Sequence, residues 1–123
     1  MENTEYSNVE YQNQLKKKLK EVENSENGFD AYMLSRELTD PADIKTCEDI
    51  IINEGDPRII LSFGLECPTC NKLRCLRSLV TNHDMEGARL LIHGAGIPLH
   101  EATAELKRIK MELNDEDILS LLL

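Results

Sequence analysis

The sequence has few aromatic side chains: no tryptophan, two phenylalanines and three tyrosines in 123 residues. Its core must therefore consist mainly of leucine and isoleucine, which favours packed helices over a β-sandwich or a β-barrel. With 41% hydrophobic and 30% charged residues, the composition is that of a globular protein, which excludes wholesale disorder. The length predicts one domain with a single modest core.

Positive charge and long apolar runs are also in short supply. The 23 acidic and 14 basic residues give a net charge of -9, so most of the surface repels phosphate and we expect no nucleic-acid binding. The longest apolar run is far below a spanning helix and no N-terminal signal segment is visible, so we expect no membrane attachment. Four cysteines without a secretion signal indicate reduced thiols and a cytoplasmic or nuclear location.

Sequence patterns of catalysis are missing as well. There is no Gly-rich phosphate loop, no metal-binding carboxylate motif, and no Ser or Cys whose spacing signals a His-Asp partnership. His83 falls in a turn, and His93 lies near a helix end, where a partly positive imidazole is favoured. We therefore expect no enzymatic activity and no cofactor.

The most informative stretch is 74–102, RCLRSLVTNHDMEGARLLIHGAGIPLHEA. Apolar residues keep a helical spacing as far as Val80, and residues 81–84 then interrupt it with side chains suited to turns and N-caps. A second helical pattern starts at Met85 and stops at 94–96, where glycine tolerates a left-handed C-cap. The stretch predicts two helices and the start of a third.

This arrangement resembles an ankyrin repeat. It has a short helix, a tight turn, a second helix with a Leu-Leu near its end, and Gly-Ala-Gly where the family usually has Gly-Ala-Asp. Pro98-Leu99-His100-Glu101-Ala102 is similar to the opening of the next repeat's first helix, where the resemblance implies a structural hydrogen bond for His100. Ile97 replaces the family's threonine, and the hairpin before Pro98 is almost absent.

Upstream, a polar tail over residues 1–8 precedes a helix that begins at Val9. One apolar stripe of this helix consists of Tyr11, Leu15, Leu19 and Val22, while its Lys16, Lys17, Lys18 and Lys20 form a solvated face flanked by glutamates. Residues 29–38 predict a helix whose buried side carries Phe29, Tyr32 and Met33, with Leu34 as a further candidate. Asp40 as N-cap and Pro41 at the first position start another helix, which ends before Gly55.

The remaining segments are less regular. For residues 58–73 both strand and helix fit the composition. A long amphipathic helix follows, with an apolar stripe formed by Leu99, Ala102, Leu106, Ile109 and Leu113. Asn114 is predicted to cap a final helix that ends in consecutive leucines.

The resemblance covers residues from about 30 to 123 and implies an all-α fold, a short stack of antiparallel helix pairs. Residues 1–28 are then a tail and an N-terminal capping helix, and residues 29–123 are three degenerate units with an irregular connection at 58–73. It also implies protein-protein binding, as an adaptor or a stoichiometric inhibitor. The surplus of acidic residues between Asp30 and Glu66 predicts a partner with a basic or mixed-charge surface. The candidate partner-binding residues are acidic Asp40, Asp43, Glu48 and Asp49, and a basic island of Lys72, Arg74 and Arg77.

The C-terminal leucines suggest a further interface. Side chains of consecutive residues spread around a helix, so Leu119, Leu121, Leu122 and Leu123 should not all be buried within one protomer. Either the chain continues, or a second copy or a partner covers this end, and we expect a homodimer through the C-terminal helix.

Two other interpretations stay open. Cys67-Pro68-Thr69-Cys70 followed by Cys75 has the spacing of part of a zinc site, with Cys47, His83 or His93 as a fourth ligand. That would make the chain a zinc-stabilised helical module, although no second ligand pair is visible and we expect a metal-free protein. A compact helical interaction domain of death-fold type is the other alternative.

Overall fold

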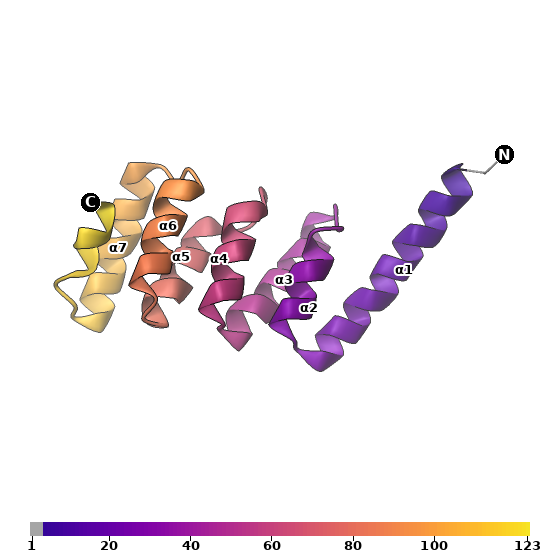
Figure 1. Cartoon of the computed structure of the whole chain (residues 1–123), viewed down its shortest axis with the longest axis horizontal. Coiled ribbons are helices and arrows are strands. Elements are labelled where there is room, and N and C mark those ends of the chain that lie inside the picture. The colour runs from indigo at the N-terminus through magenta and orange to yellow at the C-terminus, as the bar shows by residue number, and fades with distance from the viewer. Residues whose placement is uncertain (1–3) are drawn as a thin grey trace. The chain divides into compact units, whose positions relative to one another are not determined.

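The structure is a computed structural model that describes residues 4–123, with side chains from Val9 onward (Figure 1). Within this range there are seven α-helices, one 3-10 helix and no strand. The all-α expectation is confirmed. The contacts divide the chain into two compact units, residues 1–54 and 55–123.

Unit 1 contains three helices, α1 (Thr4–Ser25), α2 (Gly28–Ser35) and α3 (Pro41–Glu54). The α1 helix contacts both α2 and α3, and α2 packs along α3. Helical structure starts at Thr4, within the segment predicted to be a polar tail, and the first three residues of that tail lie outside the described range. The helix predicted as an N-terminal cap therefore shares one unit with the next two helices.

Capping side chains set the helix starts of unit 1. Asn27 caps α2, because its Oδ1 accepts a hydrogen bond of 3.0 Å from the backbone N–H of Asp30. Asp40 accepts one of 2.9 Å from the N–H of Ala42, and Pro41 is the first residue of α3. The start predicted for this helix is confirmed.

The core of unit 1 only partly follows the predicted stripes. Leu15, Leu19 and Val22 are buried as expected, but Tyr11 is 42% exposed. Of the side of α2 predicted to be buried, only Leu34 is confirmed, at 4% exposed. Phe29 and Met33 are 54% and 43% exposed, and Tyr32 is half-buried.

Small residues explain which side of α2 is buried. Its buried residues are Gly28, Ala31, Leu34 and Ser35. A Cβ atom on Gly28 would lie only 2.6 Å from the Glu54 carboxylate of α3, and the Gly28 N–H donates to that carboxylate at 3.1 Å. Three of the four buried residues on this side are small, and the large Phe29 and Met33 point outward.

Unit 2 contains α4 (Pro57–Glu66), α5 (Lys72–Thr81), α6 (Met85–Gly94), α7 (Leu99–Leu113) and the 3-10 helix η1 (Ile118–Leu122). The contacts α4 to α6 and α6 to η1 form one row, and α5 contacts α7 in a second row (Figure 1). In residues 58–73, where the composition fits both a strand and a helix, the structure has the helix α4 as far as Glu66. Asp56 caps it through a 3.0 Å hydrogen bond from the Arg58 N–H, and Pro57 is its first residue.

The C-terminal end differs from expectation. Asn114 has φ +54 and is the C-cap of α7, so it does not cap a following helix. The last segment is a five-residue 3-10 helix without a side-chain cap bond. On α7 the buried stripe is narrower than predicted: Ala102, Leu106 and Ile109 are buried, whereas Leu99 and Leu113 are exposed.

Gly96 ends the α6 turn with φ +68, as the sequence predicts, and no atom would contact a Cβ there within 4 Å. The cost of a side chain at this position is therefore purely conformational. Gly96→Ala should lower the free energy of unfolding by about 1 kcal/mol, and Gly96→Asn by less, since asparagine visits the left-handed region more readily. Urea denaturation measures both, and an alanine variant as stable as wild type would contradict the backbone explanation.

Candidate protein-binding groove

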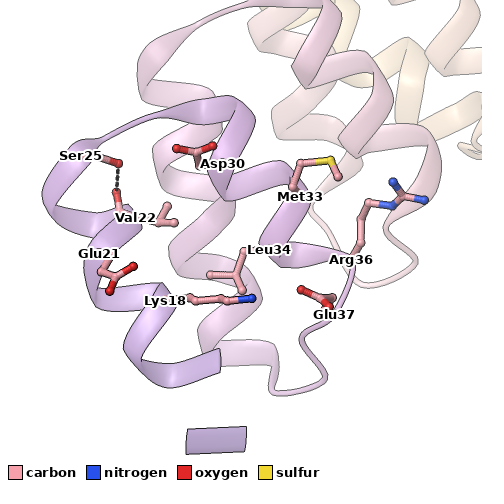
Figure 2. Close-up of a pocket in the computed structure, with 9 residues that line it drawn as sticks. All are labelled: Lys18, Glu21, Val22, Ser25, Asp30, Met33, Leu34, Arg36 and Glu37. Carbon is pink, nitrogen blue, oxygen red and sulfur yellow. Dashed lines mark hydrogen bonds between the residues drawn. The ribbon is translucent and has the colours of Figure 1, made fainter. Parts of the chain in front are cut away.

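The pocket of interest is an open groove of about 800 Å³ between α1 and α2 of unit 1 (Figure 2). Its floor is formed by the buried side chains of Val22 and Leu34, and the exposed Met33 stands beside them. Ser25 lines the groove where α1 ends. Charged side chains make up the rest of the lining: Lys18, Glu21, Asp30, Arg36 and Glu37.

The local sequence determines the shape of this groove. Helix α1 closes with a 2.9 Å hydrogen bond from the N–H of Glu26, at φ +54, to the carbonyl of Val22, and α2 starts two residues later at Gly28. This short connection makes the two helices antiparallel. At the other end, Tyr11 of α1 donates a 2.9 Å hydrogen bond to Glu37, just after α2.

Most charges on the rim have no internal partner. Within residues 4–123, Lys18, Glu21 and Asp30 make no side-chain hydrogen bond or ion pair, and their side chains are exposed. Glu37 accepts the Tyr11 hydroxyl, and this hydrogen bond raises the pKa of Tyr11. The Arg36 guanidinium lies 5.9 Å from the centroid of the Tyr32 ring. The rim thus offers charged groups that water solvates in the free protein.

The four acidic residues that the sequence predicts to bind a partner do not form one exposed surface. Glu48 is only 5% exposed in the free chain, so the acidic surface that the sequence predicts does not extend over it. Asp40 is used as the cap of α3, and Asp43 is half-buried. Asp49 is exposed and pairs with Lys45 at 3.3 Å.

The basic island also forms hydrogen bonds within unit 2. The Lys72 ammonium donates to the carbonyls of Gly64 at 2.8 Å and Cys67 at 2.9 Å, which closes the C-terminal end of α4. Arg77 of α5 bonds to Glu105 at 2.9 Å and also to Glu112, both on α7. Arg74 is half-buried. Lys72 and Arg77 therefore serve the packing of unit 2, and a role of this island in partner binding stays a prediction.

Glu105 is the centre of this polar network. Its side chain is 10% exposed and accepts hydrogen bonds from Arg77 at 2.9 Å and from Nε of Arg108 at 3.0 Å. Burial by itself raises the pKa of Glu105, but the bonds from the two guanidinium groups outweigh it, so the pKa lies below its usual value. The network joins α5 to α7.

The cysteines do not assemble the predicted ligand set. Cys67 and Cys70 are half-buried near the end of α4, and Cys75 is buried in α5. The Cys70 sulfur lies 3.1 Å from the carbonyl oxygen of Cys67. Among residues 4–123, no group of three or more His, Cys, Asp or Glu side chains is arranged to hold a metal ion.

The C-terminal leucines are unequal in burial. Leu121 is 1% exposed and packs within unit 2. Leu119 and Leu122 are half-buried. Leu123 is 95% exposed.

The sequence patterns do not predict the groove, because they assign its apolar residues to the core and its lysine to a solvated face. A usable signal exists in α2: Gly28, Ala31 and Ser35 follow a helical spacing of small residues, which marks the side that packs closely. Phe29 and Met33, four residues apart on the other side, must then face outward. For Lys18 and Glu21, the sequence contains no comparable signal that they line a groove.

In comparisons with protein-family models, curated proteins and solved structures, no match to the chain was found. Among residues 4–123, no helix is both long enough and apolar enough to cross a membrane.

Glu105→Gln should destabilise the protein by about 1–3 kcal/mol at pH 7, because two guanidinium groups lose their carboxylate partner. The folded pKa of Glu105 is lowered, so its contribution is complete above the unfolded pKa and is lost as the pH falls through the folded value. The difference between variant and wild type should therefore shrink in acid. Urea denaturation from pH 7 downward measures this, with exposed Glu101→Gln on the same helix as the control; a gap that stays constant with pH would contradict it.

Lys72→Met should cost about 1–2 kcal/mol, since the last carbonyls of α4 lose a charged donor. The matched control is Lys107→Met, an exposed lysine of α7, which should change stability by less than about 0.5 kcal/mol. Thermal unfolding followed by circular dichroism compares the two variants. Equal stability of both would show that the α4 end does not need Lys72.

Proposed function

We propose that the chain is a protein-protein interaction module, an adaptor or a stoichiometric inhibitor, which binds a segment of a partner protein in the groove between α1 and α2. The observation that carries this proposal is the groove itself: an apolar floor of Val22 and Leu34 beside exposed Met33, with charged side chains along its rim.

The shape of the groove favours a protein segment over a small molecule. Small-molecule sites enclose most of the ligand in a largely apolar cavity. Here the floor is apolar, but five of the nine lining residues are charged. A partner segment can bury a row of apolar side chains on the floor and keep its polar residues at the rim.

Methionine and phenylalanine extend the contact surface. Phe29 and Met33 lie one helical turn apart on α2 and are both about half exposed. Aromatic residues and methionine are enriched in protein interfaces, and the flexible thioether adapts to different partner side chains. These residues belong to the interface in this proposal, together with the groove.

Charge favours a partner with a basic or mixed-charge surface. Residues 1–54 contain 13 acidic and 6 basic residues, a net charge of -7 (6 minus 13). Such a surplus accelerates association with a basic partner, and salt screens the attraction. Nucleic acid does not fit this charge.

The repeat resemblance is compatible with this proposal. The two rows of unit 2, α4–α6–η1 and α5–α7, are what stacked helix pairs would give, and they support the relation to ankyrin-like repeats inferred from the sequence. Repeats of this kind act by binding and not by catalysis. We place the protein in the cytoplasm or the nucleus on its reduced thiols.

Affinity capture from a cell lysate tests the function with a matched pair of variants. Met33→Glu puts a charge into the groove, and Met111→Glu makes the same change at an 85% exposed site on α7. A specific partner should be captured by wild type and by Met111→Glu, and at least tenfold less by Met33→Glu. The wild-type complex should also weaken as salt rises. Equal capture by both variants would place the function elsewhere.

A further inference from the structure

Cys67 and Cys70 lie at the two ends of a turn that directly follows α4. Residues 68 and 69 form the turn, and Pro68 occupies its first central position, where the fixed φ of proline is favoured. The turn brings the Cys70 sulfur to 3.1 Å from the carbonyl oxygen of Cys67. The Cα atoms at the ends of a β-turn lie within about 7 Å of each other, and a disulfide needs about 4.4–6.8 Å. The backbone therefore holds these two cysteines close to the separation of a disulfide.

The ammonium group of Lys72 lies beside the Cys70 sulfur. An ammonium group has three N–H donors, and three acceptors surround this one. They are the carbonyl oxygens of Gly64 at 2.8 Å and Cys67 at 2.9 Å, and the Cys70 sulfur at 3.6 Å. Because the two carbonyls fix its position, the ammonium lies where it stabilises a negative charge on this sulfur.

The end of α4 acts in the opposite sense, since the last carbonyls of a helix carry partial negative charge. Besides the Cys67 carbonyl, those of Gly64 and Phe63 lie 3.9 and 4.0 Å from the Cys70 sulfur. Lys72 donates to two of these three carbonyls, which offsets their effect on the sulfur. The lysine therefore determines whether Cys70 reacts as a thiolate.

From this arrangement we infer that the turn is a site of reversible thiol oxidation, in which a hydroperoxide oxidises Cys70 and Cys67 then closes a disulfide with it. The site belongs to unit 2, and the inference does not depend on the proposed function, because no residue of the groove takes part. In a reducing compartment such a disulfide is transient and serves as a redox signal.

The reaction has two steps. The Cys70 thiolate attacks the terminal oxygen of the hydroperoxide, so that an S–O bond forms, the O–O bond breaks, and the other oxygen leaves and takes up a proton. The sulfur is oxidised to a sulfenic acid and the peroxide is reduced. The Cys67 sulfur then attacks the Cys70 sulfur: the S–S bond forms, the S–O bond breaks, and the hydroxyl leaves as water with the Cys67 proton. A low-molecular-weight dithiol reverses the oxidation by exchange.

The other cysteines have different surroundings. Cys47 and Cys75 are 0% exposed, so a dissolved peroxide does not reach them in the folded protein. Cys67 is half-buried, and its sulfur lies 3.8 Å from the hydroxyl of Thr69. Within residues 4–123 no cationic side chain bonds to the Cys67 sulfur, which is why Cys70 reacts first and Cys67 second.

Hydrogen peroxide added to the folded full chain tests the site. After alkylation, mass spectrometry should find the loss of two hydrogen atoms in the peptide that contains Cys67 and Cys70, and dithiothreitol should restore them. Cys47 and Cys75 should remain reduced and accept the alkylating reagent only after denaturation.

Two pairs of variants test the roles, and circular dichroism confirms that each is folded. Cys67→Ser should accumulate a sulfenic acid on Cys70 that dimedone traps, whereas Cys70→Ser should form an adduct on Cys67 about tenfold more slowly. Lys72→Met should slow the oxidation of Cys70 about tenfold, and Lys107→Met should leave its rate unchanged.

Three results overturn the inference: equal reaction of all four cysteines, a disulfide that forms only between two chains on a non-reducing gel, or a dimedone adduct that forms as fast on Cys67 as on Cys70. Each of these results leaves the proposed function of the groove untouched, since capture of a partner through Met33 is measured with the thiols reduced.

Discussion

Helices of eight to ten residues are too short to be stable alone in water, and α2, α4, α5 and α6 all fall in this range. Each leaves up to four backbone N–H groups without a helical partner at its start. In all four, the preceding Asn or Asp accepts one of these N–H groups: Asn27, Asp56, Asn71 and Asp84. These caps fix where each helix begins, and therefore which residues face the core and which face the groove.

Besides their caps, these short helices need close packing against one another. With Phe63 as the only aromatic side chain in the core of the described residues, the helices must approach closely to exclude water. Gly28 and Gly64 allow this, because a Cβ at either would lie within 3 Å of Glu54 or Leu91. The same closeness on one side of α2 leaves its large side chains outside, beside α1. The groove is therefore a consequence of how α2 packs against α3.

The sequence predicts those features whose cause is local. Caps such as Asp40 and Asp84, the left-handed Gly96 and the stripe of Leu15, Leu19 and Val22 depend on neighbours within a few residues, and sequence patterns reveal all of them. Features that depend on a distant partner leave no such pattern. Arg77 finds Glu105 28 residues away, and no periodicity reveals that pairing.

For other residues, the size or charge of the side chain predicts the wrong burial. Large apolar residues are usually buried, which is why the sequence favours Phe29 and Met33 as core residues, whereas in an eight-residue helix the small residues take that place. The charge of Glu48 favours the surface, but its position on α3, one turn after buried Ile44 and one turn before buried Ile51, puts it inside. The candidate groove depends on which side of α2 is buried against α3. The large residues of α2 point to the wrong side, whereas its small residues mark the right one.

Electrostatics differ in role between the two units. In unit 2 many basic residues serve the fold: Lys72 closes α4, Arg77 and Arg108 hold Glu105, and Lys110 pairs with Glu116 at 3.0 Å. In unit 1 none of the four lysines of α1 pairs with a carboxylate within the described residues. Solvated charges cost little to leave unpaired, and they become useful only when a partner arrives with the opposite sign. Unit 2 therefore uses its basic side chains to join its own helices, whereas unit 1 leaves the lysines of α1 to water.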